Sequence, residues 1–286
     1  MRQHRMTGWA EYRRSASGVF GLAVLGICVV LALTAPLFIS RGDLTAISAP
    51  GSPFQPPSAR FPLGTDSLGR SMVDVTIWGA RISLTVGFLA TFMSVGIGTV
   101  TGVAAGHFRG WAAAILMRVT DWFLVLPTLV LAAALASVLR PGISTVILAI
   151  GITSWPSTTR LVRAQTLTLE ERPYVERARA LGGGHLHVIT RHVLPGVMPI
   201  VLAQATLSVA GAILAEATLA FLGLSDSTKV SWGTALEQAH TTGAVSAGYW
   251  WMLLPPGIAI AVVSLAFTLC GRAMEAALNP RLRGQA

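Results

Sequence analysis

The sequence predicts an all-α integral membrane protein with six transmembrane helices. Of its 286 residues, 53% are hydrophobic and only 12% are charged, and the mean hydropathy is +0.64. Soluble domains carry about a quarter charged residues, so this composition argues against a soluble fold. The apolar residues also gather into six runs. Each run has roughly the 20 residues that a helix needs to cross a bilayer.

The first apolar run follows a basic N-terminal segment. Residues 1–18 carry four arginines against one acidic residue, and the 21 residues from Val19 to Ile39 have no charge. A secretory signal peptide has the same order of features, but its apolar core spans about 7–15 residues. We therefore expect a retained first transmembrane helix at residues 19–39. Residues 40–81 are interrupted by proline, glycine and serine, so they are expected to form a loop outside the bilayer.

Residues 82–274 are expected to form a core of five transmembrane helices. The apolar runs of this core begin at Ile82, Trp111, Ile143, Val197 and Trp251. The second span carries glycines that suit close helix packing in lipid, namely Gly87, Gly96, Gly98 and Gly102. Pro127 predicts a kink in the third span, and Pro156 predicts a break in the fourth. The aromatic residues 249–251 at the start of the sixth span suit a membrane interface.

Charge predicts the orientation of the core. Polar loops interrupt it at residues 160–196 and 224–250, and a tail follows at 275–286. Six spans place both termini and the loop 160–196 on one side of the membrane. That side holds 15 of the 21 basic residues, so by the positive-inside rule it is cytoplasmic. The loops 40–81 and 224–250 are then extracytoplasmic.

The cytoplasmic loop contains the most distinctive polar segment, Tyr174 to Pro195. Its first part is predicted to be a short helix that begins at Pro173 and ends at the glycines 182–184. On a helical wheel one side of this helix carries Tyr174, Val175, Ala178, Leu181 and Gly182. Arg172 and Arg179 lie within reach of Glu176 across a helical turn.

After the glycines, Leu186, Ile189 and Val193 recur at helical spacing until Pro195, which is expected to end the pattern. The segment is therefore predicted to be a helix, a glycine elbow and a second helix. Its small residues Ala178 and Gly182 let another backbone come close, which suits docking. The alternative is a surface hairpin that merely connects two spans.

No pattern in the sequence predicts enzymatic chemistry or a bound cofactor. A phosphate-binding glycine loop, a nucleophilic triad and Cys/His metal spacing are all missing from the sequence. The cysteines Cys28 and Cys270 lie inside apolar runs, and His185, His187 and His192 are expected on a solvated loop face. The arginines flank apolar spans, which excludes a nucleic-acid-binding protein.

Two acidic residues stand out within the spans. Glu216 is the only acid deep inside an apolar run, so it is a candidate intramembrane functional site. The alternative for Glu216 is a glutamate at a subunit interface or near the outer rim of the membrane, bonded to a neighbour. Asp121 is expected to form a local ion pair with Arg118, three residues earlier.

The segment 174–195 resembles the cytoplasmic loop of bacterial binding-protein-dependent import permeases. That loop has the pattern Glu-Ala-Ala, three residues, Gly, nine residues, Ile-x-Leu-Pro. The residues that match it are Glu176, Ala178, Gly182, Leu194 and Pro195. Arg177 replaces the middle alanine, and His192 stands at the isoleucine position.

Other segments resemble the C-type permease subunits of dipeptide and oligopeptide importers. They are FPLGTDSLGR (61–70), GARISL (79–84), FLGL (221–224), SWG (231–233), WWMLLPPGIAI (250–260), LAFTLCG (265–271) and NPR (279–281). The resemblance covers roughly residues 15–283. Phe61, Ser71 and Arg272 depart from the residues usual in that family.

The resemblance implies a type I ABC importer permease of the bacterial inner membrane. Such a subunit forms half of a pore with a second homologous permease. It receives peptide cargo from an extracytoplasmic binding protein or lipoprotein, and it rests on two ATPase subunits that bind ATP and Mg. The resemblance implies a role in coupling to the ATPase for Tyr174, Glu176, Ala178, Leu181, Gly182, Leu194 and Pro195.

Two alternatives for the function remain open. The same architecture carries other cargo in related permeases, such as nickel chelates or oligosaccharides. An ion-coupled secondary transporter would need ionisable residues at mid-membrane, and only Glu216 meets that requirement.

Overall fold

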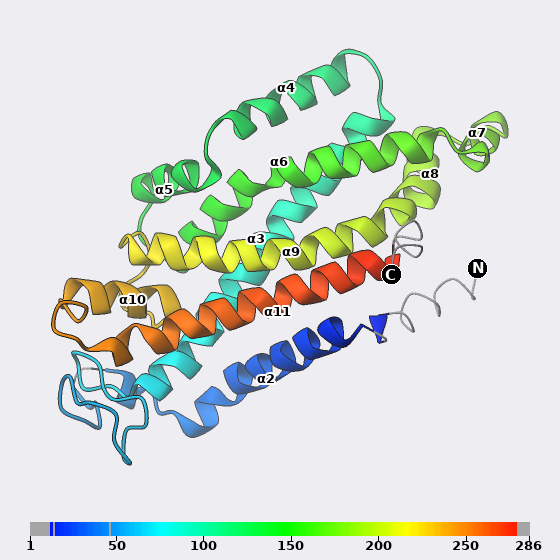
Figure 1. The fold of residues 1–286 in the computed structure, drawn as a ribbon. Helices are drawn as coiled ribbons and strands as arrows, with labels where there is room; N and C mark the ends of the chain where they lie inside the picture. Colours follow the sequence, from blue (N-terminus) through cyan, green and yellow to red (C-terminus); the bar gives the residue numbers. More distant parts are fainter. Residues whose placement is uncertain (1–11, 14, 46, 279–286) are drawn as a thin grey trace.

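The computed structural model describes residues 12–13, 15–45 and 47–278, and within them the regular structure is entirely helical. The long helices run side by side in a bundle (Figure 1). Its first half consists of α2 (Ala16–Phe38), α3 (Met72–His107), α4 (Trp111–Val125), α5 (Thr128–Val138) and α6 (Ile143–Glu170). The second half consists of α7 (Pro173–Ala180), α8 (His185–Val188), α9 (Leu194–Phe221), α10 (Trp232–Thr241) and α11 (Leu254–Leu278). Short turns η1 (Gly42–Leu44), η2 (Ile189–Val193) and η3 (Trp250–Met252) complete it.

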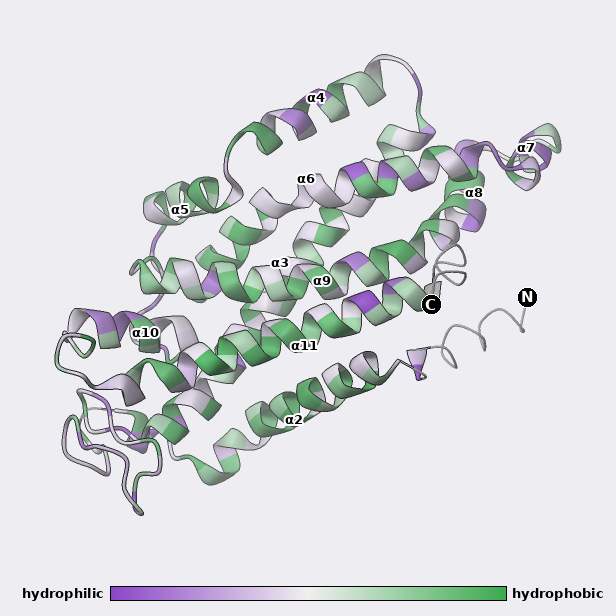
Figure 2. Cartoon of the chain, viewed as in Figure 1, coloured by the Kyte–Doolittle hydropathy of each residue, from purple (hydrophilic) through white to green (hydrophobic). Residues whose placement is uncertain are grey.

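The structure confirms an all-α membrane protein but does not match six spans exactly as predicted. Four helices in the described residues are long and apolar enough to cross a membrane, and the bent pair α4–α5 would make a fifth. Helix α6 has 28 residues and is continuous, but its apolar sequence is interrupted by a polar stretch, TSWPSTT, at residues 153–159. Figure 2 shows this contrast, because α2 and α11 are largely hydrophobic whereas α6 is mixed. The N-terminal segment, the tail and the NPR motif lie largely outside the described residues.

Prolines account for three differences from the predicted spans. Pro127 does not kink a helix but separates α4 from α5, whose axes differ by 88°. Leu126 before it is extended, as residues that precede proline prefer to be. Pro156 was predicted to break the fourth span, but α6 continues through it to Glu170 while packed along α3.

Pro195 likewise does not end a helix, because a continuous helix runs from His185 to Phe221. The π-helical turn η2 lies just before this proline, and the amide of Leu194 donates to the carbonyl of Ile189 five residues back. Proline lacks an amide donor, and the wider turn accommodates its ring without stopping the helix.

Helices α3 and α6 pack closely along a row of glycines. A Cβ atom at Gly98, Gly102 or Gly106 would lie 2.6–2.7 Å from the side chain of Thr158, Val162 or Thr166, respectively, and 2.8–3.1 Å from a backbone oxygen of α6. Gly87 packs in the same way against Ile213 of α9, whereas Gly96 faces open space. The predicted role in helix packing is therefore confirmed for Gly87, Gly98 and Gly102, whereas Gly96 makes no such contact among the described residues.

We expect Gly102→Leu to destabilise the bundle by about 1–3 kcal/mol, because a backbone oxygen of α6 cannot move aside for the new side chain. That oxygen, on Thr159, would lie 2.8 Å from the added Cβ. Thermal unfolding in detergent measures the loss. Gly96→Leu is the matched control and is expected to unfold like the wild type. Equal unfolding temperatures for the two variants would contradict the close contact.

The two polar loops predicted at 40–81 and 224–250 fold together at one end of the bundle. Helix α3 already begins at Met72, ten residues before its predicted start, and Ser71 caps it by accepting from the amide of Asp74. The buried Arg70 pairs with Asp66 at 2.5 Å and donates to Gln238 of α10. Trp251 was expected at a membrane interface, but it is only 8% exposed and its indole donates to the carbonyl of Thr65.

Candidate functional site

The segment 173–193 lies at the end of the bundle opposite α10 (Figure 1). It follows α6 directly and leads into α9, so both of its ends continue into long helices. The predicted helix, glycine elbow and second helix are all present, as α7, residues 181–184 and α8 with η2.

Two glycines form the elbow for different reasons. Gly182 has a φ of +87°, a left-handed conformation that is strained for any residue with a side chain. Gly183 donates to the carbonyl of Ala178 at 2.9 Å, and a Cβ on Gly183 would lie 2.6 Å from that oxygen. The elbow therefore turns tightly back on the end of α7.

Valines anchor the loop to the bundle. Val175 of α7, Val188 of α8 and Val193 of η2 are fully buried in one cluster with Leu169 and Val197. Of the five residues predicted to share one side of α7, only Val175 is buried. Val175 turns into the valine cluster, whereas the other four are exposed or partly exposed and face away from the chain's own core.

A polar clamp fixes the same loop to the ends of α3 and α6. It consists of His107, Glu170, Arg179 and His185. Oε1 of Glu170 lies 2.6 Å from Nδ1 of His107, and Nε2 of His107 lies 2.9 Å from Nδ1 of His185. Arg179 forms an ion pair with the other oxygen of Glu170. A buried carboxylate needs such partners, since leaving it unpaired is costly.

The ion pair of Arg179 differs from the predicted one, and the clamp as a whole was not predicted from the sequence. Arg179 pairs with Glu170 rather than with Glu176, which makes no ion pair within the described residues. His107 and Glu170 lie 63 positions apart, and no local spacing connects them. The only sequence signal was the position of His107 just after the predicted second span, since Glu170 falls inside the predicted loop 160–196.

The exposed side of the loop is concave, and we call it the docking surface. It is a shallow, open hollow of about 740 Å³, lined by Tyr174, Arg177, Ala178, Leu181, the glycines 182–184, His187 and His192. Leu181 is 89% exposed there. The ring of His192 packs against Tyr174 and His187 at centroid distances of 6.0 and 5.7 Å. A large exposed apolar side chain beside small residues suits contact with another protein.

The docking surface brings together four of the seven predicted coupling residues. Tyr174, Ala178, Leu181 and Gly182 line it. Glu176 is exposed outside its lining, Leu194 packs against the valine cluster, and Pro195 is exposed at the start of α9. The shared motif therefore combines residues that form the surface with residues that support it.

Glu216 lies in the interior, where it joins three helices. It is 1% exposed, and its Oε2 accepts from the hydroxyl of Ser83 of α3 at 2.9 Å. The same hydroxyl accepts from the amide of Trp232 at the start of α10. Within this chain the carboxylate is therefore bonded to a neighbouring helix, α3, in the interior of the bundle.

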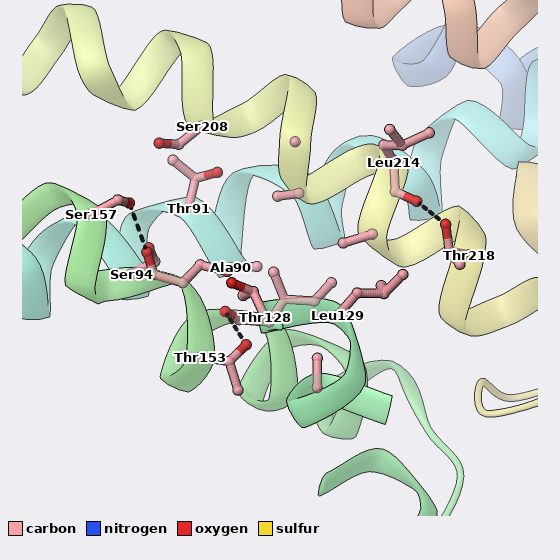
Figure 3. Close-up of a pocket in the computed structure, with 16 residues that line it drawn as sticks. Ala90, Thr91, Ser94, Thr128, Leu129, Thr153, Ser157, Ser208, Leu214 and Thr218 are labelled. Atoms are coloured by element: carbon pink, nitrogen blue, oxygen red, sulfur yellow. Dashed lines mark hydrogen bonds between the residues drawn. The ribbon is translucent and has the colours of Figure 1, made fainter. Parts of the chain in front are cut away.

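A second cavity, of about 420 Å³, lies within the bundle between α3, α5, α6 and α9 (Figure 3). Its lining contains no charged residue and many hydroxyl groups, those of Thr91, Ser94, Thr128, Thr153, Ser154, Ser157, Ser208 and Thr218. Most of these come from the polar stretch of α6 and the facing turns of α3 and α9. Glu216 does not line it.

Asp121 forms its ion pair with Arg160 of α6 at 2.7 Å, not with Arg118 as predicted. The partner of Asp121 is therefore a residue of the neighbouring helix and not the residue three positions earlier.

Residues 98–284 match the family model described as the binding-protein-dependent transport system inner membrane component. The chain belongs to this family. The match covers the docking surface, the clamp and most of the hydroxyl-lined cavity. The chain is therefore a membrane component of a binding-protein-dependent transport system, and its several apolar helices fit a multi-pass membrane protein.

Relatives of this membrane component match nearly its whole length. It is 34% identical over 280 residues to a dipeptide transport system permease protein of Bacillus subtilis, covering 96% of this chain and 85% of that protein. It is 36% identical over 284 residues to a di/tripeptide transport system permease protein of Pseudomonas aeruginosa, covering 97% and 92%. An amino acid ABC transporter of known structure superposes with a TM-score of 0.49 at 18% identity, covering 74% of this chain and 94% of that one.

Proposed function

We propose that this chain is a permease subunit of an ATP-driven importer of dipeptides or oligopeptides. The observation that carries the proposal is the docking surface, an outward-facing concavity whose supporting loop is tied to two long helices. In this proposal the surface receives an ATPase subunit that supplies ATP and Mg, since the sequence has no ATP-binding pattern of its own.

The contacts of the loop allow a displacement of α7 to be transmitted to the long helices. The valine cluster and the clamp fix α7 to α3, α6 and α9. Helices α3 and α6 are in turn locked together by the glycine row, so displacement of α7 moves them as one body. The same two helices and α9 line the hydroxyl-lined cavity, which we assign to the translocation path.

The cargo follows from the relatives and fits the cavity. Both relatives described above are named as permeases for dipeptides or di/tripeptides. Uncharged hydroxyl groups offer donors and acceptors to a peptide backbone without selecting the charge of its side chains. The remaining parts of the proposed assembly are a second homologous permease, a second ATPase subunit and an extracytoplasmic binding protein or lipoprotein.

We also propose that α6 and the bent pair α4–α5 each cross the bilayer, giving six spans with both termini and α7 in the cytoplasm. Arg177 lies on the exposed side of α7. A cysteine introduced at this position is therefore expected to react with an impermeant thiol reagent in inside-out vesicles and to stay unlabelled in intact cells. Labelling from outside intact cells would show that α7 lies on the opposite side of the membrane.

The proposed function is tested by uptake into proteoliposomes that contain the complete transporter, with ATP enclosed at the ATPase side. We expect accumulation of a radiolabelled dipeptide that requires both ATP and the loaded binding protein. A nickel chelate and an oligosaccharide serve as competing cargo. Uptake of either in place of peptide would overturn the cargo, and uptake driven by a proton gradient without ATP would overturn the mechanism.

A further inference from the structure

A third cavity opens between the ends of α3, α4 and α6, and no part of the proposed transport mechanism uses it. Its volume is about 700 Å³. Three arginines line it, Arg109 before α4 and Arg160 and Arg163 of α6, together with Asp121 of α4. Apolar side chains, among them Met117 and Leu167, form the rest of its wall.

The positive charge of this cavity is only partly compensated. Asp121 pairs with Arg160, and Nε of Arg163 donates to the carbonyl of Ala105 at 3.3 Å. Arg109 is exposed, and neither it nor Arg163 makes an ion pair within the part of the chain that the structure describes. Two guanidinium groups thus remain free to bind an anion, and arginine forms strong charge-assisted hydrogen bonds with phosphate.

The position of the cavity indicates what kind of anion it takes. It lies beside the last turns of α3, where Gly106 packs against Thr166 of α6, and so at the level where the bundle leaves the apolar layer. Helix α4 beside it carries exposed apolar side chains, including Trp111 at 78% exposure, together with Ile115 and Trp122. A ligand that satisfies both features has an anionic head and a long apolar tail.

We propose that this cavity binds an anionic phospholipid, with its headgroup phosphate at Arg109, Arg160 and Arg163 and an acyl chain along α4. Basic pockets between helices at the membrane surface suit such headgroups. The bound lipid fills the space between α4 and α6 and holds the two helices at a fixed separation. The site is distinct from the docking surface and from the hydroxyl-lined cavity, since it shares no lining residue with either.

The test uses the complete transporter in phosphatidylcholine nanodiscs, titrated with phosphatidylglycerol and followed by native mass spectrometry. The variants are Arg109→Gln and the double variant Arg109→Gln/Arg163→Gln, which remove the two arginines that make no ion pair among the described residues. We expect each lost arginine to weaken binding of phosphatidylglycerol about fivefold, so that the double variant binds about 25-fold more weakly. Arg118→Gln is the matched control, because Arg118 is an exposed arginine of α4 that does not line the cavity. It is expected to change binding less than twofold.

Several outcomes would overturn the site. Unchanged lipid affinity in both Arg109 variants would do so, as would an equal loss in Arg118→Gln, which would reflect only the general surface charge. Displacement of the lipid by millimolar inorganic phosphate would assign the cavity to free phosphate instead. Cross-linking of a cysteine at position 109 to a partner subunit would assign it to a protein helix. Because Arg109 is exposed, the single variant is expected to fold. A loss of lipid binding in this variant therefore cannot be attributed to misfolding.

Discussion

Leu181→Asp is expected to abolish ATP-driven uptake while leaving the membrane subunit folded. Leu181 is 89% exposed on the docking surface, so a charge there costs the separate chain little. When an ATPase subunit covers the surface, the same charge is buried without a partner, which costs several kcal/mol. We therefore expect ATPase stimulation by the loaded binding protein, and peptide uptake, to fall about 100-fold.

Leu186→Asp provides the matched control for this prediction. Leu186 is 75% exposed on α8, yet it does not line the docking surface. Its replacement introduces the same charge into the same loop and is expected to leave uptake within about threefold of the wild type. Similar losses in both variants would show that the loop as a whole, rather than the concave surface, governs coupling. Full activity of Leu181→Asp would show that the ATPase binds elsewhere.

Much of the docking loop could be predicted from local sequence. Pro173 and the glycines 182–184 set the start and end of α7, because backbone chemistry alone determines them. The direction in which its apolar side faces could not be predicted. A helical wheel groups Tyr174 and Leu181 with Val175, but only the tertiary fold decides that Val175 turns inward.

Ion pairs were predicted from neighbours three or four positions away, and the tertiary fold overrode them. Exposed pairs at this spacing contribute only about 0.2–0.5 kcal/mol, so a partner on another helix easily replaces them. Arg179 accordingly pairs with the buried Glu170. Asp121 pairs with Arg160 of the neighbouring helix, although both side chains are about half exposed. The same limit hid the clamp, whose partners come from four separate elements.

The membrane spans, unlike the ion pairs, could largely be predicted from local sequence. Their apolar runs are a local property, so α2, α3, α9 and α11 could be located within about ten residues at their ends. Helix α6 was expected to break near Pro156, because proline removes a local hydrogen bond of the helix. Its packing along the glycines of α3 keeps it continuous, and that contact depends on residues about 60 positions apart.

Glu170→Ala is expected to release the docking loop from the spans. The variant leaves the buried ring of His107 without its carboxylate and frees Arg179. Removing one partner of a buried polar pair costs about 2–3 kcal/mol. Local opening of residues 173–184 should then become roughly 30- to 150-fold more frequent. Hydrogen exchange of these amides and tryptic cleavage after Arg177 measure the change.

Glu170→Ala is also expected to weaken the coupling of ATP hydrolysis to transport, because a loosely attached α7 transmits less displacement to α3 and α6. We expect fewer peptides transported per ATP hydrolysed, while the docking surface still binds the ATPase. Glu171→Ala is the matched control, since Glu171 is the adjacent carboxylate, is exposed and makes no ion pair among the described residues. Glu170→Gln separates the two halves of the clamp, because its amide oxygen still accepts from His107 but carries no charge for Arg179. Equal exchange rates in Glu170→Ala and Glu171→Ala would mean that the valine cluster alone holds the loop.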